Sequence, residues 1–309
     1  MFQRIVRGAK EWSGRTIRVP VKLSKNITGG SYRGFDTFST AATDNRQYME
    51  FTPSCYQITC ALPGDELSVA DTEDKILDLI KLTIQSDTED MADDIGTMFY
   101  ADGTGNSNKD MLGLGALVDD GNTVDSIGGL SRSTYPTLAS TVTASGGTLT
   151  LAKIDTLFAA VSSGSQKPTA YYTTETIWNL YGQLLRPQER IVKETGRIKG
   201  LIGGTGFSAL EYNAKPILGD EKCTSGVFFA LNEDFLEFRA LKSFGAKPIS
   251  YKSQIEGNDY DAPIGLGFSW SDWIIPANAD SRVGHIYFKG QFIGTNSKRQ
   301  GKLTGITGI

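Results

Sequence analysis

Apolar and polar residues alternate in two stretches near the N-terminus, a period of two that is typical of β-strands. The first stretch runs from Arg15 to Leu23, and the second lies between Met49 and Leu62. The segment between them, Ser24 to Tyr48, is rich in Gly, Ser, Thr and Asn. The pattern predicts a long two-stranded excursion with a poorly ordered tip. Because an isolated two-stranded hairpin is marginal in water, we expect it to lean on another surface.

The strongest helical pattern follows the break at Pro63-Gly64. Between Thr72 and Tyr100, apolar residues recur at a spacing that places them on one face of a helix. These residues are Ile76, Leu79, Ile80, Thr83, Ile84, Met91, Ile95, Met98 and Phe99. The pattern predicts a helix over 72–100 that is about 43 Å long. Left-handed glycines in the sequence DGTGN at 102–106 are expected to end it.

The second half of the chain alternates helical and strand patterns. Helices are expected after Thr150 and after Thr174, where a threonine can cap the first turn. Strands are expected at 169–173, 210–218 and 226–231, and the tail from His285 to Leu303 again alternates. This order predicts a compact α/β or α+β domain over roughly 150–260.

The 309 residues carry a formal net charge of −4, so overall charge does not indicate nucleic-acid binding. The distribution is more informative, because residues 1–33 hold eight basic side chains against Glu11 alone, and residues 71–94 hold nine acids against two lysines. The tail from Ser281 is basic again. The basic arm and the acidic helix are complementary and can pair within one subunit or between copies. A solvated arm, or an arm on nucleic-acid phosphates, is the alternative.

Few residues offer chemistry. Three cysteines indicate a reducing compartment, and Cys55 and Cys60 fall on opposite faces of one strand. His285 is the single histidine, which disfavours a Ser-His-Asp triad and excludes histidine-rich metal sites, although a carboxylate site stays open. Residues 204–209 match a dinucleotide fingerprint only loosely, and a strand pattern follows where a helix is required. We therefore predict no catalytic, metal or cofactor site. No apolar run is long enough for a transmembrane helix.

The order of these features resembles the major capsid proteins of tailed bacteriophages, with their Hong Kong 97-type fold. Residues 1–13 resemble the N-terminal arm and 14–62 the extended E-loop. Residues 63–149, with the helix at 72–100 and the sequence FYADGTGNSN, resemble the peripheral domain and its spine helix. Residues 150–265 resemble the axial domain, and GHIYFKGQFIGTNSKRQGKLTGI in 266–309 resembles the C-terminal return to the peripheral domain. The resemblance implies an α+β capsid fold.

The resemblance also implies a function. Copies would assemble into hexamers and pentamers of an icosahedral virion shell around double-stranded DNA, held by non-specific contact, after assembly in the host cytoplasm. Some relatives begin with a long cleaved scaffolding region that this sequence lacks, so either the scaffolding protein is separate or the sequence is the mature form, and Met1 favours a separate scaffold. A portal and a decoration protein are further implied partners. The inter-subunit contact candidates are Arg15, Arg18, Lys22 and Lys25 on the arm and E-loop, and Asp87, Asp90 and Asp94 on the helix.

Three alternatives remain open from the sequence. An encapsulin-type shell shares the fold and encloses a cargo enzyme instead of DNA. An α/β nucleotide-binding enzyme would use the domain at 150–260, with a phosphate-binding loop for which only the weak 204–209 match exists. A phage tail or decoration protein would lack both the long acidic helix and the E-loop-like excursion.

Overall fold

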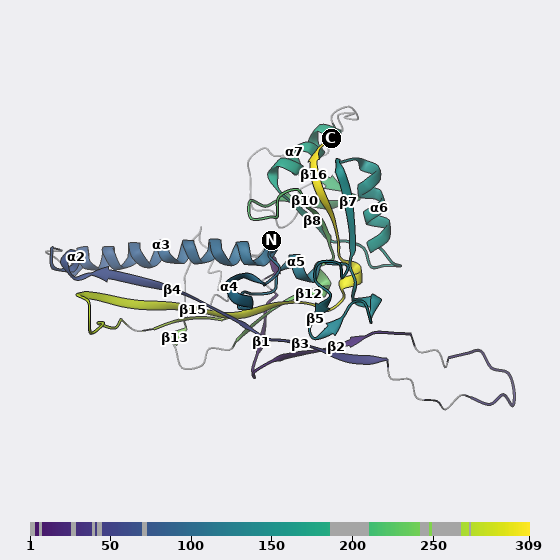
Figure 1. Ribbon diagram of the computed structural model, residues 1–309, viewed down its shortest axis with the longest axis horizontal. Coiled ribbons are helices and arrows are strands. Elements are labelled where there is room, and N and C mark those ends of the chain that lie inside the picture. The colour runs from purple at the N-terminus through teal and green to yellow at the C-terminus, as the bar shows by residue number, and fades with distance from the viewer. Residues whose placement is uncertain are drawn as a thin grey trace, which may run out of the picture. The chain divides into compact units, whose positions relative to one another are not determined.

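The computed structural model describes residues 4–5, 8–25, 29–38, 41, 45–69, 73–185, 210–241, 247–248, 267–271 and 273–309. The chain divides into two compact units (Figure 1). Unit 1 consists of Met1–Ala139 and Phe235–Ser297, and unit 2 consists of Ser140–Asp234 and Lys298–Ile309. The predicted loose match at 204–209 lies outside the described residues.

Unit 1 is built on a six-stranded sheet with one long helix packed along it (Figure 1). The strand order is β1 (Lys10–Trp12), β12 (Leu236–Leu241), β15 (Ser281–Gly294), β14 (Phe268–Trp270) and β13 (Lys247–Pro248), and β4 (Ser54–Pro63) also pairs with β15. The helix is α3 (Glu73–Tyr100), which lies against β4. A separate two-stranded ribbon consists of β2 (Ile17–Lys22) and β3 (Arg46–Phe51). The shorter elements are α2 (Gly64–Val69), α4 (Gly105–Asn108), α5 (Leu114–Leu117), β5 (Ser126–Ile127), β6 (Leu130–Ser131) and the 3-10 turn Pro136–Leu138.

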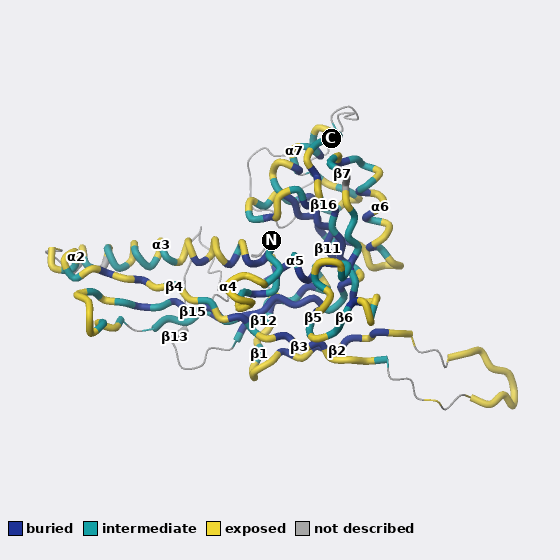
Figure 2. Tube along the Cα trace, in the orientation of Figure 1, coloured by how far each residue is buried: buried dark blue, intermediate teal, exposed yellow. Residues whose placement is uncertain are grey.

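Helix α3 confirms the long helix expected from the apolar spacing. Its C-terminal half is the more deeply buried part (Figure 2), where Met91, Ile95 and Phe99 are almost fully enclosed. The helix ends at Tyr100, and the Asp102 carboxylate accepts hydrogen bonds from the Thr104 backbone N–H at 3.0 Å and hydroxyl at 2.7 Å. These bonds hold the pKa of Asp102 below its usual value. Gly103 has a φ of 81°, so the DGTGN sequence ends the helix as expected.

The prediction that 14–62 forms one two-stranded excursion is wrong in its second strand. Residues 46–51 pair with β2, but β4 pairs over ten residues with β15, from Ser54↔Gly290 to Pro63↔Ser281. The chain turns between the two strands at Thr52-Pro53, and proline cannot donate to a sheet hydrogen bond. The alternating pattern at 54–62 remains correct, because Cys60 and Leu62 are buried on the side that meets α3 while Cys55 is exposed.

Unit 2 is a second six-stranded sheet with two helices. Its strand order is β7 (Thr141–Thr148), β16 (Gly301–Gly308), β11 (Phe228–Leu231), β8 (Ala170–Thr173), β10 (Lys215–Gly219) and β9 (Glu211–Tyr212). Helices α6 (Leu151–Val161) and α7 (Glu175–Leu185) contribute to one hydrophobic core with the sheet. The Thr150 hydroxyl accepts from the Lys153 backbone N–H, which confirms the expected cap of α6. The 3-10 turns Glu233–Phe235 and Ser297–Arg299 lie where the chain passes between units.

The boundaries of the units differ from the predicted division into 63–149, 150–265 and 266–309. Strand β12 belongs to unit 1, because it pairs with β15 and with the N-terminal strand β1. The last twelve residues belong to unit 2, because β16 is inserted between β11 and β7. Both differences arise from pairings between strands far apart in the sequence, which a local pattern does not specify.

Candidate inter-subunit interface

The ribbon β2–β3 presents one apolar and one basic face. Its buried side chains are Ile17, Val19, Val21, Met49 and Phe51. This face rests on neighbouring loops of unit 1: the Glu50 backbone N–H donates to the Gly128 carbonyl at 2.9 Å, and the Thr137 hydroxyl donates to the Leu23 carbonyl at 3.1 Å. The ribbon therefore leans on another surface, as expected for an excursion with only two strands.

The opposite face of the ribbon carries the predicted basic candidates. Arg18 and Lys22 are exposed on β2, Arg15 precedes the strand, and Lys25 follows it, also exposed. Arg18 Nε lies 2.7 Å from a Glu50 carboxylate oxygen across the ribbon, with both side chains about half exposed or more. An ion pair this exposed contributes only about 0–1 kcal/mol, so it can be exchanged for a contact with another molecule.

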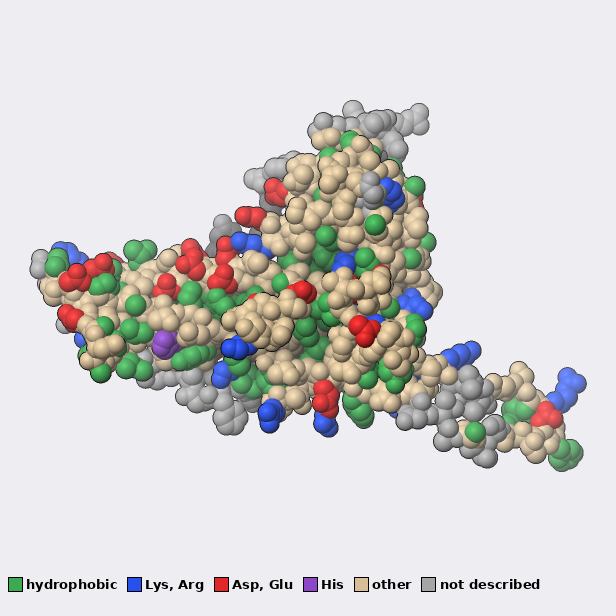
Figure 3. Space-filling view, viewed as in Figure 1, with side chains coloured by type: hydrophobic (Ala, Val, Ile, Leu, Met, Phe, Trp, Pro, Cys, Tyr) green, Lys and Arg blue, Asp and Glu red, His purple; other side chains and the backbone are tan. Residues whose placement is uncertain are grey.

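The acidic candidates on α3 do not all face the same way. Asp90 and Asp94 are exposed (Figure 3 shows acidic side chains gathered over this helix), and the Tyr56 hydroxyl of β4 donates to the Asp94 carboxylate. Burial and the Asp94 carboxylate raise the pKa of Tyr56 to about 12, so the phenol stays a donor. Asp90 and Asp94 are four residues apart, and like charges at this spacing destabilise a helix by a few tenths of a kcal/mol. Positive charge from another molecule would relieve this small repulsion.

Asp87, the third acidic candidate, has different surroundings. It lies on the face of α3 that meets β4, where it accepts a hydrogen bond from the Cys60 thiol, and its Oδ2 atom is buried without a partner. Burial and the Asp87 carboxylate raise the pKa of Cys60 to about 12. The Asp87 carboxylate thus already has a contact in its own chain, and its part in an inter-subunit contact stays a prediction.

Replacing Asp87 by leucine is expected to raise the free energy of unfolding by about 1–2 kcal/mol, because an unsatisfied buried acceptor is removed from an otherwise apolar contact. Urea-induced unfolding measures the change. Asp90→Leu is the matched control on the exposed side of the helix, with an expected change within about 0.5 kcal/mol. A clear loss of stability in Asp87→Leu would show that the Asp87–Cys60 contact is stabilising.

Sequence reasoning missed two features of unit 1. Residues 10–12, taken as part of the N-terminal arm, form a parallel strand with β12. Lys10 Nζ lies 2.6 Å from Oε1 of Glu237, whose other carboxylate oxygen, Oε2, lies 2.7 Å from Arg239. The second feature is the set of aromatic residues in YRGFDTF at 32–38, inside a segment described only as polar. Three aromatic residues in seven was the signal that could have drawn attention to the exposed aromatic side chains of this loop.

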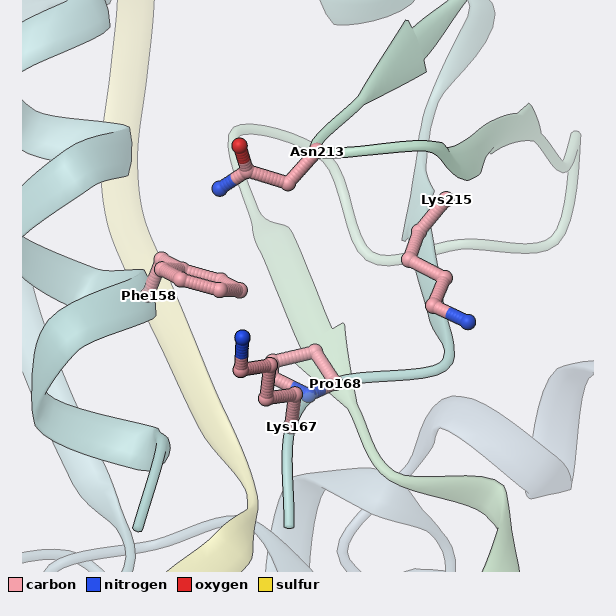
Figure 4. Close-up of a pocket in the computed structure, with 5 residues that line it drawn as sticks. All are labelled: Phe158, Lys167, Pro168, Asn213 and Lys215. Carbon is pink, nitrogen blue, oxygen red and sulfur yellow. The ribbon is translucent and has the colours of Figure 1, made fainter. Parts of the chain in front are cut away.

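The enzyme alternative has one cavity to consider in unit 2, about 280 Å³ in volume and lined by Phe158, Lys167, Pro168, Asn213 and Lys215 (Figure 4). Lys167 and Asn213 point into it, and the Lys215 ammonium group points away. The lining offers no carboxylate, thiol or hydroxyl, so it does not assemble an acid–base pair or a nucleophile. His285 lies in β15, where its Nδ1 is 3.1 Å from the Thr59 hydroxyl. Across the described residues there is no cluster of three metal-ligating side chains, and none of the helices is long and apolar enough to cross a membrane.

Comparison with known proteins identifies the fold through structure alone. No family model matches the sequence, and no curated protein matches it. Solved structures do match along nearly the whole chain, and phage capsids and an encapsulin are among them. The chain therefore has the Hong Kong 97-type capsid fold, as the order of its elements suggested.

Three of these structures illustrate the range of proteins that share the fold. The capsid protein of cyanophage A-1(L) is 18% identical, with a TM-score of 0.73 over 98% of this chain and 91% of its own. The capsid protein of the Myoviridae phage XM1 is 12% identical, with a TM-score of 0.58 over 99% and 91%. The holo-SrpI encapsulin of Synechococcus elongatus is 12% identical, with a TM-score of 0.59 over 96% and 84%. Phage capsids and an encapsulin thus share this fold.

Proposed function

We propose that the protein is a major capsid protein, a structural subunit that self-assembles into the head shell of a tailed bacteriophage. The observation that carries the proposal is the extent of the likeness: a phage capsid chain matches over 98% of this chain and 91% of its own length. The shell would consist of hexamers and pentamers enclosing double-stranded DNA in the virion. A separate scaffolding protein and a portal are the partners expected during assembly in the host cytoplasm, and a decoration protein is a further candidate partner.

The charges of unit 1 suggest how copies recognise one another. The outer face of the ribbon, with Arg18 and Lys22, would lie against Asp90 and Asp94 of α3 in a neighbouring copy. Such complementary patches orient partners and raise association rates, and salt screens them. Arg15 and Lys25 flank the same face and extend it.

Negative-stain electron microscopy of the expressed protein, alone and with a scaffolding protein, tests the function directly. Closed shells or capsomer rings are the expected result. A monomer or dimer under every condition would refute the proposal.

The charge contact has its own prediction. The double variant Arg18→Glu/Lys22→Glu is expected to reduce shell yield about tenfold or more, because it places like charges in the contact, while the midpoint of unfolding changes little. Particle yield by sedimentation and urea-induced unfolding measure the two effects. Arg282→Glu/Lys298→Glu removes the same charge from exposed sites elsewhere and serves as control. Adding Asp90→Lys/Asp94→Lys to Arg18→Glu/Lys22→Glu is expected to restore the shell yield. An unchanged shell yield in Arg18→Glu/Lys22→Glu alone would contradict the contact.

The encapsulin match supports a second candidate, a shell that encloses a cargo protein. The two functions differ in what the particles contain. Nuclease-protected DNA in purified particles would support the virion shell, and a co-purifying folded protein without DNA would support the cargo compartment.

A further inference from the structure

The described residues that line the cavity of unit 2 include two lysines and no acid. Phe158 comes from α6, Lys167 and Pro168 directly precede β8, and Asn213 and Lys215 belong to the β9–β10 hairpin. Among the described residues, neither lysine takes part in an ion pair. The cavity therefore carries positive charge that favours an anionic ligand.

The polar groups of the cavity lie beside an aromatic ring. The Phe158 ring, the Lys167 side chain and the Asn213 carboxamide all point into the cavity (Figure 4). Phe158 is only partly buried, and its ring meets that of Tyr212 edge to face with centroids 5.9 Å apart. A positive charge and an amide beside an aromatic ring suit a ligand with both a planar apolar part and an anionic group.

The acid closest to this ring on α6 is engaged elsewhere. Asp155 lies three residues before Phe158 and so on the same side of the helix. Its carboxylate accepts a hydrogen bond from the Tyr212 hydroxyl. Burial and this hydrogen bond raise the pKa of Tyr212, so the phenol stays a donor to Asp155. The contact holds the carboxylate on Tyr212 and leaves Lys167 for a ligand.

The turn that presents Asn213 has a strained backbone. Tyr212 pairs with Lys215, so Asn213 and Ala214 form a two-residue hairpin turn, and their φ values are 50° and 58°. Asparagine followed by glycine is the preferred sequence for such a turn, and alanine is strained at a positive φ. This conformation fixes the direction in which the Asn213 side chain leaves the hairpin.

We infer that this cavity binds a nucleoside monophosphate, a planar base joined to a phosphate group. The base would lie against Phe158 and Pro168, the phosphate would pair with Lys167, and the Asn213 carboxamide would donate to the ligand. The cavity volume of about 280 Å³ lies just below the usual range of small-molecule sites, about 300–1,000 Å³. A lone phosphate ion would leave most of it empty.

The chemistry of the site favours a free nucleotide over double-stranded DNA. The bases of a duplex are paired and stacked, so they cannot lie against the Phe158 ring without leaving the helix. The inference adds a small-molecule ligand to the proposed shell subunit and does not depend on assembly, because every residue of the site belongs to one unit of one chain.

Equilibrium dialysis of the full-length chain, and of assembled shells, against radiolabelled deoxyadenosine monophosphate tests the site. Saturable binding is the expected result. Deoxyadenosine and inorganic phosphate are each expected to compete at least about tenfold more weakly than the nucleotide, because each makes only part of the contacts. An absence of saturable binding would overturn the inference, as would equal competition by inorganic phosphate or by duplex DNA.

Two variants assign the binding to this cavity. Lys167→Glu is expected to weaken it about tenfold or more, because the charge that pairs with the phosphate is reversed. Asn213→Gly is expected to weaken it about fivefold through the loss of a hydrogen bond, while glycine preserves the positive φ of the turn. Lys298→Glu is the matched control, because Lys298 is exposed in unit 2 outside the cavity, and its affinity is expected to equal that of wild type.

Thermal unfolding of each variant checks that the fold is intact. Wild-type affinity in both Lys167→Glu and Asn213→Gly would overturn the site. Such a result would leave the shell function untouched, since electron microscopy measures assembly separately from nucleotide binding.

Discussion

Replacing Arg132 by methionine is expected to lower the free energy of unfolding by about 3–5 kcal/mol, the cost of breaking a buried charged network. Arg132 is only 2% exposed. Its guanidinium donates to the carbonyls of Leu138 at 3.2 Å, Ala116 at 2.7 Å and Leu117 at 3.2 Å, and to that of Val124. Methionine preserves much of the volume but leaves these buried acceptors without a donor.

The surroundings of Arg132 explain why the charge is tolerated. Burial lowers the pKa of Arg132, and the nearby carboxylates of Asp119, Asp120 and Asp125 oppose that shift, so the side chain keeps its charge. Asp119 in turn accepts from the backbone N–H groups of Gly121, Thr123 and Val124. The network organises the loops at 116–138 on which the ribbon β2–β3 rests.

Urea-induced unfolding measures the effect of Arg132→Met. Arg282→Met is the matched control, since Arg282 is exposed on β15, and its expected change is within about 0.5 kcal/mol. Because Gly128 and the 3-10 turn beside Leu23 belong to the same loops, shell yield is expected to fall as well. Equal stability in the two variants would show that water or relaxed backbone replaces the guanidinium.

Replacing Gly113 by alanine is expected to destabilise unit 1 by about 2–4 kcal/mol, because the added methyl group meets backbone and has no room to move. A Cβ at this position would lie 2.4 Å from the Met98 carbonyl oxygen, 2.5 Å from that of Ala101 and 2.6 Å from that of Phe99. Met98 and Phe99 belong to the last turn of α3, and Ala101 directly follows it. The Gly115 N–H donates to the same Ala101 carbonyl at 3.0 Å, so this backbone segment caps the helix.

Thermal unfolding followed by circular dichroism measures the Gly113→Ala effect. Gly30→Ala is the control, because a Cβ there meets nothing within 4 Å and the backbone needs no positive φ. The control is expected to be neutral, so the difference isolates the steric contact from the general effect of losing a glycine. A neutral result at Gly113 would mean that the end of α3 shifts freely.

Local patterns predicted most of the elements but only part of the interface. Arg15, Arg18, Lys22 and Lys25 are exposed in the structure, and a side chain that contacts another copy must be exposed in the single chain. The acidic pattern gave no reason to separate Asp87 from its neighbours, although the structure places it beside Cys60 of β4. At a rotation of 100° per residue, it falls with Ile84 and Met91 on the apolar stripe, and a strict reading of the spacing would have placed it there.

The sequence by itself determined the elements whose causes are local: the length and apolar stripe of α3, the alternation of β2 and β4, the threonine cap of α6, and the glycine that ends α3. Each follows from side chains within a turn or two of one another. Only the tertiary structure decided that β4 pairs with β15 instead of extending the ribbon, and that β16 joins the sheet of unit 2. A period of two shows that a segment is a strand, but any strand with the right face can pair with it. The choice among partners is made by packing, here by α3 covering β4 and by the core beneath α6 and α7.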